Sequence, residues 1–508
     1  MPSPSLPPPH ATRREWIGLG VIALPCLLYS MDLTVLNLAV PSLTRDLAPS
    51  STQLLWIIDI YGFLVAGSLI TMGTLGDRIG RRRLLLIGAV AFGAASVLAA
   101  SATSAATLIA ARAALGLAGA TLAPSTMSLI RNMFLDARER SVAIGVWFAS
   151  YSAGAVIGPP LGGVLLHYFW WGSVFLISVP MMVLVLILGP RLLPEFKDPA
   201  AGRPDVPSAI LSVAAVLGII YGFKEISVHG LGSLPVLSIV LGAGLGAAFV
   251  RRQRRLADPL IDLKLFQAPA FTASLAIYLL ATFAVFGPYV FIAQYLQLVL
   301  GLSPLAAGLY STPFALGFVV GSIVSPILAR RVRPAPFMIA GLLVAAAGFV
   351  LLAQVSATSG LTTVVISAVI FSLGLSPVFT LSNDLIIGTA PPERAGAAAG
   401  ISETCSELGG ALGIAILGSV GSAIYRRAMA GAVPAGVTAD LAHAARETLG
   451  GAAAAAARLP DLGPALLDSA RHAFTAGMRV TALAAAVVVL GIGVVAWTYV
   501  GMAEVSGD

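Results

Sequence analysis

Long apolar segments dominate this sequence and constrain its fold more than any other feature. A helix that crosses a hydrocarbon core about 30 Å thick needs about 20 mostly apolar residues. Fourteen stretches meet this requirement: residues 16–40, 53–73, 83–101, 105–130, 141–166, 171–189, 208–226, 233–250, 269–300, 305–329, 336–354, 361–388, 396–424 and 474–503. The sequence therefore predicts an all-α polytopic membrane protein with 14 transmembrane helices.

The composition excludes three other classes of protein. Hydrophobic residues make up 58% of the 508 residues and charged residues only 10%, whereas soluble domains are about 25% charged. The mean hydropathy of +0.93 describes the whole chain, which excludes a soluble domain on a single anchor and also a disordered chain. The apolar runs are much longer than the strands of about ten alternating residues in a transmembrane β-barrel.

Basic residues predict the orientation of the chain, because cytoplasmic loops of membrane proteins are rich in Lys and Arg. With the N-terminus inside, most of the 30 Lys and Arg residues fall in inner loops, whereas the short outer loops hold only Arg45. An even number of spans returns the C-terminus to the inside. We therefore expect both termini on the cytoplasmic side of a bacterial inner or plasma membrane. The net charge of +7 then reflects these loops rather than a nucleic-acid site.

Similar inner loops predict an internal repeat. Glu139-Arg140 precedes the fifth span and Glu393-Arg394 the thirteenth, and Arg81-Arg82 and Arg330-Arg331 recur at a similar offset. Repeated halves are typical of secondary transporters, whose substrate sites lie between the repeats near the membrane midplane. We expect three units: an N-terminal six-helix bundle at 1–190, an inserted central helix pair with basic loops at 191–262, and a C-terminal six-helix bundle at 263–508.

One sizeable loop, residues 425–473, falls on the outer side. It is rich in Ala, and helix formers between Thr438 and Leu449 favour short helices on the outer surface. The alternative is a flexible spacer.

The loop between the second and third spans reads GTLGDRIGRRR from Gly73 to Arg83 and resembles the signature loop of the major facilitator superfamily. Glycines let helices approach closely, and Asp77 can pair with arginines and with a helix N-terminus. We expect this loop to hold the cytoplasmic side shut in one state and to release it in another, the alternative being simple anchoring. The residues of this gating loop are Gly73, Gly76, Asp77, Arg78, Gly80, Arg81 and Arg82.

The fourth and fifth spans carry two further motifs. LIAARAALGLAGA resembles the fourth-helix motif of the superfamily around a buried arginine, here Arg112. The fifth span resembles the helix motif of the antiporter branch, which implies export rather than import. Small residues at four-residue spacing allow close helix contact, and proline removes a backbone hydrogen bond. The motif residues are Gly154, Gly158, Pro159, Gly162 and Gly163.

Two more spans narrow the resemblance to one family and one subgroup within the superfamily. MDLTVLNLAVP in the first span is similar to the first-helix motif of the fourteen-helix drug:proton antiporter family, with Asp32 as its acid. FWWGSVFLISVP in the sixth span resembles the quaternary-ammonium-compound exporter subgroup of QacA/SmvA type. The resemblance implies the major facilitator fold and proton-coupled multidrug efflux by alternating access. The implied substrates are hydrophobic, often cationic compounds such as quaternary ammonium biocides, dyes and antibiotics.

Three ionisable residues of the first bundle lie at one depth. Inserting an acidic side chain at the bilayer centre costs about 2.5–3.5 kcal/mol of free energy on insertion scales, so such a residue is expected to have a function or a partner. Asp32, Asp59 and Arg112 each lie within a span, at similar distances from its outer end. We expect a charge cluster in which Arg112 governs how readily the two carboxylates hold a proton, the alternative being salt-bridged packing groups.

The second bundle holds a pair of deep acids. Glu403 and Glu407 are four residues apart, so they share one helix face. Two like charges in a dry cavity resist ionising together, so we expect one of them to hold a proton at neutral pH. Such a site can exchange a proton for a cation. Lys224 and Glu225 are expected instead at the outer interface, in a structural role.

Aromatic side chains within the spans are candidates for cation–π contacts with an organic cation, although each can equally serve packing. The candidates are Tyr29, Trp56, Trp147, Phe286, Tyr289 and Phe379.

Two other functions stay open from the sequence alone. A dedicated exporter of one metabolite or self-made antibiotic would need the same motor, whereas a membrane-embedded enzyme, the remote alternative, would need a clustered constellation that the scattered histidines do not give. A phosphate-binding loop with a lysine is absent from the sequence, so the expected driving force is the proton gradient rather than ATP. We expect no enzyme activity, cofactor or metal, and a monomer that meets small hydrophobic or cationic molecules, protons and lipid.

Overall fold

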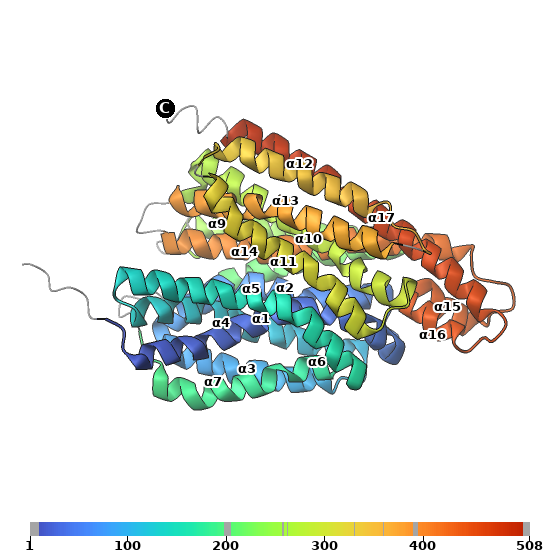
Figure 1. The fold of residues 1–508 in the computed structure, drawn as a ribbon, viewed down its shortest axis with the longest axis horizontal. Coiled ribbons are helices and arrows are strands. Elements are labelled where there is room, and N and C mark those ends of the chain that lie inside the picture. Colours follow the sequence, from blue (N-terminus) through green and yellow to red (C-terminus); the bar gives the residue numbers. More distant parts are fainter. Residues whose placement is uncertain are drawn as a thin grey trace, which may run out of the picture.

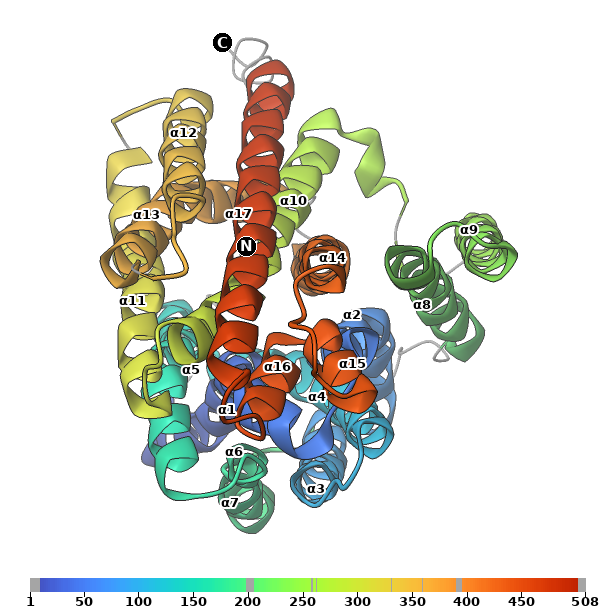
Figure 2. The same cartoon turned by 90° about the vertical axis from the view of Figure 1, so that its right-hand side faces the viewer.

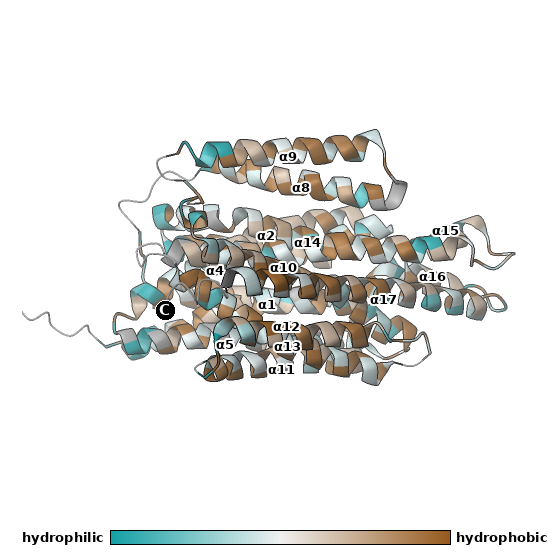
Figure 3. Ribbon diagram, turned by 90° about the horizontal axis from the view of Figure 1, so that it is seen from above, coloured by the Kyte–Doolittle hydropathy of each residue, from teal (hydrophilic) through white to brown (hydrophobic). Residues whose placement is uncertain are grey.

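The computed structural model describes residues 10–197, 205–256, 259–261, 263–329, 331–358, 360–389 and 395–500. Fourteen helices in these ranges are long and apolar enough to cross a membrane, and each overlaps one of the predicted segments. Figure 3 shows hydrophobic residues along the middle of the helices and hydrophilic residues concentrated towards their ends. The predicted all-α architecture with 14 spans is confirmed. Glu393-Arg394 and Arg330 of the predicted repeat lie outside the described residues.

The N-terminal bundle contains six spans. The sixth is built from two consecutive helices, α6 and α7, because the short α6 ends where α7 begins. The bounds are α1 Arg13–Leu47, α2 Ser51–Ile79, α3 Arg81–Ala100, α4 Ala105–Met133, α5 Ala137–Tyr168, α6 Ser173–Leu176 and α7 Ser178–Leu192.

The inserted pair consists of α8 Val206–His229 and α9 Ser233–Gln253. Figure 2 shows the two helices side by side at the edge of the molecule, with α8 on the side of α2 and α14, both of which it contacts. At the N-terminus of α8, Asp205 accepts a hydrogen bond from the backbone N–H of Ser208. Arg252 of α9 pairs with the same carboxylate at 2.9 Å, which fixes the two helices to each other.

The C-terminal bundle contains the other six spans and the short helices of the long loop. Its first span ends in a π-helix and its last span continues into another. The bounds are 3₁₀-helix η1 Leu265–Gln267, α10 Pro269–Gln294, π-helix η2 Tyr295–Val299, α11 Pro304–Ala329, α12 Pro334–Leu352, α13 Leu361–Gly388, α14 Ala395–Ala430, α15 Ala439–Glu447, α16 Leu449–Ala456, α17 Gly463–Val495 and π-helix η4 Ala496–Val500.

Helix ends are fixed by local capping in the sequence. Thr12, Ser50 and Ser104 each accept a hydrogen bond from a backbone N–H in the first turn of α1, α2 and α4, and each belongs to a capping box. These side chains satisfy N–H groups that have no partner within the helix. The caps therefore set where the apolar segments begin as helices.

The molecule has two distinct ends (Figure 1). We call the end that carries Arg13 of α1 and Val500 of η4 the terminal end, and the opposite end, which carries α15 and α16, the loop end. The start of α1 and the end of η4 therefore lie on the same side, as an even number of spans requires.

The long loop contains two short helices, α15 and α16, so the predicted helices are confirmed and the flexible spacer is wrong. Tyr425 near the end of α14 donates a hydrogen bond to the carbonyl oxygen of Ala445 in α15, at 2.7 Å. The loop is shorter than the predicted 425–473, because α14 continues to Ala430 and α17 already begins at Gly463. Alanine-rich sequence propagates helix beyond the apolar segment, which moves both boundaries.

The two bundles meet along two seams. On one seam α5 packs on α11, and a Cβ on Gly163 would lie 2.7 Å from the carbonyl oxygen of Pro304. On the other seam α2 packs on α14, where Gly62 faces Ala411. Small residues let the backbones approach this closely.

Polar contacts join the bundles at the loop end. Gln297 donates a hydrogen bond from Nε2 to the carbonyl oxygen of Leu38, at 2.9 Å. The backbone N–H of Ser51 donates to the Glu447 carboxylate, at 3.0 Å. These contacts tie α1 and α2 of the first bundle to η2 and α15 of the second.

Candidate functional site

A cavity of about 310 Å³ lies between the two bundles. Its lining comes from α1, α2, α4 and α5 of the first bundle and from α10 and α14 of the second. All five ionisable residues predicted from the sequence line this cavity: Asp32, Asp59, Arg112, Glu403 and Glu407. Sequence depth alone placed each residue within a span, and helix packing brings the five together.

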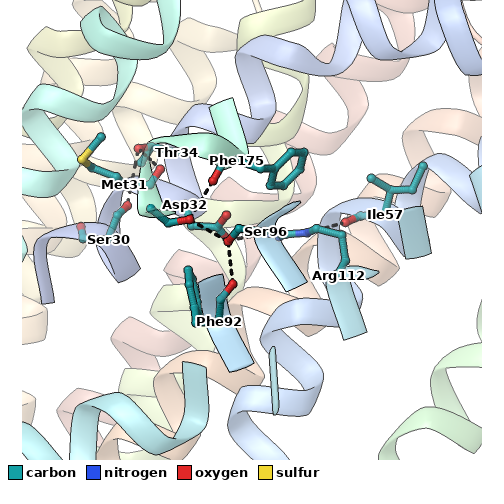
Figure 4. A network of polar contacts seen from close by, with 10 residues as sticks. Ser30, Met31, Asp32, Thr34, Ile57, Phe92, Ser96, Arg112 and Phe175 are labelled. Atoms are coloured by element: carbon teal, nitrogen blue, oxygen red, sulfur yellow. Dashed lines mark hydrogen bonds and ion pairs between the residues drawn. The ribbon is translucent and has the colours of Figure 1, made fainter. Parts of the chain in front are cut away.

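Arg112 forms the centre of the polar network on the first bundle. Its Nη1 lies 2.5 Å from the Asp32 carboxylate, and its Nε donates to the carbonyl oxygen of Ile57 at 3.1 Å. Figure 4 shows the guanidinium extended between these two partners. The guanidinium also lies over the face of the Tyr61 ring, with 4.7 Å between its central carbon and the ring centre. Arg112 is 1% exposed, so it acts as a fixed positive charge behind Asp32.

Asp59 pairs with a lysine that was expected at the outer interface. Its Oδ2 lies 2.7 Å from Nζ of Lys224 in α8, and both side chains are buried. The expected position of Lys224 at the outer interface is therefore wrong: the lysine points inward from the inserted pair. The signal available in the sequence was a charge in an otherwise apolar segment, which usually has a partner inside a bundle.

Glu403 and Glu407 come to the cavity from the same face of α14 and are half-buried. The Glu407 carboxylate reaches to 4.0 Å from the point that a Cβ on Gly62 of α2 would occupy. Among the described residues no ion pair to either glutamate is found, whereas the cations of Arg112 and Lys224 pair with the two aspartates. The glutamates are thus the carboxylates most available to a proton or a cation.

Two of the predicted aromatic residues line the cavity, Trp147 of α5 and Phe286 of α10. The wall also holds Tyr151 and Tyr278, which were not among the residues predicted from the sequence. Tyr151 lies one helical turn after Trp147, with 5.8 Å between the two ring centres. The four-residue spacing was the signal that could have found it.

The other predicted aromatic residues stand behind the wall. Tyr29 and Phe379 pack against the two wall tyrosines, with ring centres 5.4 and 5.3 Å away. Trp56 lies against Lys224, whose Nζ is 3.9 Å from the ring centre. Tyr289 is buried within the second bundle and is not part of the cavity lining. These four therefore support or pack beside the site rather than form its surface.

The predicted gating loop folds back onto its own bundle. Arg81 donates from Nε to the Asp77 carboxylate at 2.7 Å and from Nη1 to the carbonyl oxygen of Pro124 in α4 at 3.3 Å. The backbone N–H of Arg82 donates to Glu195, in the segment after α7, at 3.1 Å. Gly80 has φ +114°, a conformation that L side chains rarely adopt.

The glycines of the fifth-helix motif lie against two neighbours. A Cβ on Gly154 would lie 2.3 Å from the carbonyl oxygen of Leu27 in α1, and Gly158 and Gly162 face the same helix. Gly163 faces α11 of the other bundle, and the carbonyl oxygen of Pro159 contacts Gly308 there. The motif therefore forms one seam between the bundles and also holds α5 on α1.

Comparisons with known proteins agree with this architecture. The family profile described as the Major Facilitator Superfamily matches residues 22–414. The chain is 44% identical over 491 residues to the multidrug efflux pump LfrA of Mycolicibacterium smegmatis, covering 96% of this chain and 97% of that protein. It is 35% identical over 498 residues to the methyl viologen resistance protein SmvA of Salmonella typhimurium, covering 97% and 99%.

A solved structure has the same fold. It is a bacterial homologue of the human lysosomal transporter Spinster, in an inward-facing and unoccupied conformation. The TM-score is 0.68 at 18% sequence identity, over 97% of this chain and 98% of that one. With 14 apolar helices, the family profile and relatives of full length, the chain belongs to the major facilitator superfamily and is a multi-pass bacterial membrane transporter.

Proposed function

We propose that the chain is a proton-coupled multidrug efflux antiporter that exports hydrophobic, often cationic compounds by alternating access. One observation carries the proposal: four carboxylates line a single cavity between the bundles, and two of them have no ion-pair partner among the described residues. Such a cavity can take up protons or an organic cation in exchange. The printed names of LfrA and SmvA, an efflux pump and a methyl viologen resistance protein, support the direction and the substrate class.

The orientation follows from the same proposal. The terminal end faces the cytoplasm, in keeping with the basic residues in its loops, and the loop end faces outward. The division into units at residues 1–190, 191–262 and 263–508 is part of the proposal, as are the assignment of the gating loop to the cytoplasmic side and a monomeric state. The protein needs neither ATP nor a cofactor, metal or nucleic acid, and catalyses no reaction.

Export of a dication without net movement of charge requires two titratable carboxylates. Moving one charge across the membrane costs about 2.3 kcal/mol per 100 mV, and one pH unit contributes about 1.36 kcal/mol per proton. Exchange of two protons for one dication moves no net charge, so the pH gradient alone drives it. Glu403 and Glu407 provide two proton sites for this exchange.

Ethidium efflux from energised cells tests the function. We expect cells that express the protein to lose preloaded ethidium faster than cells with an empty vector, and a protonophore to abolish the difference. Absence of ethidium transport by protein shown to be folded and inserted would contradict polyspecific export. The remaining function would then be a dedicated metabolite exporter, to be assayed with candidate natural products.

Alternating access predicts that a cross-link at the loop end arrests transport. Thr44 of α1 faces Gly450 of α16, and a Cβ on this glycine would lie 2.7 Å from Cβ of Thr44. Disulfides need about 3.8 Å between these atoms, so a shift of about an ångström permits the bond. In a background with Cys26→Ala and Cys405→Ala, oxidised Thr44→Cys/Gly450→Cys should lose more than nine-tenths of its transport rate and regain it on reduction.

The two single-cysteine variants are the controls for this cross-link, because oxidation should leave both at their starting rates. Transport that continues in fully cross-linked protein would show that the loop end does not need to open.

A further inference from the structure

Lys224 is one of only three lysines in a chain that otherwise uses arginine for its basic residues. The other two, Lys197 and Lys264, are exposed in connecting segments. Lys224 instead reaches from α8 to Asp59, with 2.7 Å between Nζ and Oδ2, and lies over the Trp56 ring. Lys224 and Asp59 are each 1% exposed.

Asp59 belongs to the pair and to the cavity at the same time. Its carboxylate lines the cavity while Lys224 approaches it from the direction of α8. A charge buried to this degree is costly unless it is compensated. Asp59 must therefore hold a positive partner in every state, which is an ammonium group, a proton or a bound cation.

The helix that carries Lys224 lies across a seam between the bundles. Val213 of α8 fits against Gly67 of α2, where a Cβ would lie 2.2 Å from Cγ2 of the valine. One turn before Lys224, Ile220 shares a buried cluster with Phe63 of α2 and Ala411 of α14. The inserted pair therefore contacts both helices that must separate or slide when the bundles move.

We propose that Lys224 is a tethered counter-cation of the transport site, which occupies Asp59 until a proton or the charge of a cationic substrate replaces it. This inference rests on the proposed function and gives the inserted helix pair a role in it. A lysine suits this role because its ammonium is a compact point charge on a flexible stem, which can leave the carboxylate and return to it while keeping its charge. The lysine thereby sets how many protons the site exchanges for each cation.

Other charged groups surround the pair and must be separated from it in a test. Within α9 the charged residues are at its terminal end, Arg251 and Arg252. The groups that share the cavity or the helix are Arg112 of α4, Asp32 of α1, Glu403 and Glu407 of α14, and Glu225 and His229 of α8. They are the same residues in all variants below, so the compared proteins differ in charge only at Lys224 and Asp59, and in one control at Lys264.

The experiment measures ethidium affinity of the purified full-length protein from pH 6 to pH 8, by fluorescence. The change of log Kd with pH equals the number of protons released on binding. Without Lys224, Asp59 takes a proton from solution, and ethidium must displace that proton. We expect Lys224→Met and Lys224→Gln each to release one more proton per bound ethidium than the unmodified protein. Their ethidium affinity should therefore rise with pH by a further factor of ten per pH unit.

Three variants separate this role from a purely structural one. Lys224→Arg keeps the charge and should keep the unmodified slope. Asp59→Asn/Lys224→Met removes both partners and should also return the unmodified slope. Lys264→Met removes an exposed lysine and should change nothing.

The outcomes are distinguishable from failure of the proposed function. If unmodified protein shows no protonophore-sensitive ethidium transport, the proposed function fails. If unmodified protein transports ethidium, the slope of log Kd against pH decides the counter-cation role. That role is overturned if the folded Lys224→Met or Lys224→Gln protein has the same slope as the unmodified protein. Lys224→Gln keeps a hydrogen-bond donor next to Asp59, so it provides the test should the methionine variant not fold.

Discussion

Replacing both glutamates of α14, Glu403→Gln/Glu407→Gln, is expected to reduce methyl viologen export about 100-fold, which corresponds to about 2.7 kcal/mol. Glutamine keeps the shape and hydrogen bonding of each side chain but cannot take up and release a proton or balance a cation. A dication needs two negative charges in the cavity, and the glutamates offer both without displacing a cation, whereas Arg112 and Lys224 pair with the two aspartates in this structure. The measurement is uptake of methyl viologen into energised inverted vesicles.

Single substitutions and an exposed pair control this result. Each single glutamine variant should keep export of monocationic ethidium at a reduced rate and lose most export of the dication. Asp461→Asn/Asp468→Asn neutralises two acids near the start of α17 at the loop end, where both are exposed, and should transport both substrates normally. Methyl viologen export by the folded double-glutamine protein at the unmodified rate would remove these residues from the site.

The second large effect concerns the packing of α5. Gly154→Leu should destabilise the protein by about 3 kcal/mol or more, the upper range for overpacking, because its Cβ would meet the backbone of α1 rather than a flexible side chain. A Cβ at Gly154 lies 2.3 Å from the carbonyl oxygen of Leu27. We expect little folded protein on size-exclusion chromatography, and a markedly lower melting temperature for the part that folds.

The same helix supplies the matched control. A Cβ on Gly145 meets no atom within 4 Å, so Gly145→Leu should change the stability by less than about 0.5 kcal/mol. Equal melting temperatures for the two leucine variants would contradict the close contact of α5 with α1.

The fourteen spans were predictable because the bilayer requires a length of apolar sequence, and this requirement is local. Boundaries were less predictable where the sequence is rich in alanine. The start of α17 at Gly463 rather than 474 follows from helix propensity beyond the apolar segment. Hydropathy reports the transition between lipid and water, not the end of a helix.

The deep acids were predictable for a different reason. A carboxylate within an apolar segment is costly and therefore functional or paired, which identified Asp32, Asp59, Glu403 and Glu407 without any knowledge of packing. Their partners were not predictable. The direction of Lys224 depends on how α8 is rotated against α2, and Tyr278 faces the cavity because of the packing of α10 on α14. Neither is encoded in spacing along a single helix.

The most direct test of the account reconstitutes the purified protein in liposomes with a pH dye inside and imposes an ethidium gradient without any other energy source. Outward movement of ethidium should drive protons inward against their own gradient, and Glu403→Gln/Glu407→Gln should abolish the proton movement. Ethidium transport without any proton movement would contradict proton-coupled antiport and the central role given to the cavity carboxylates.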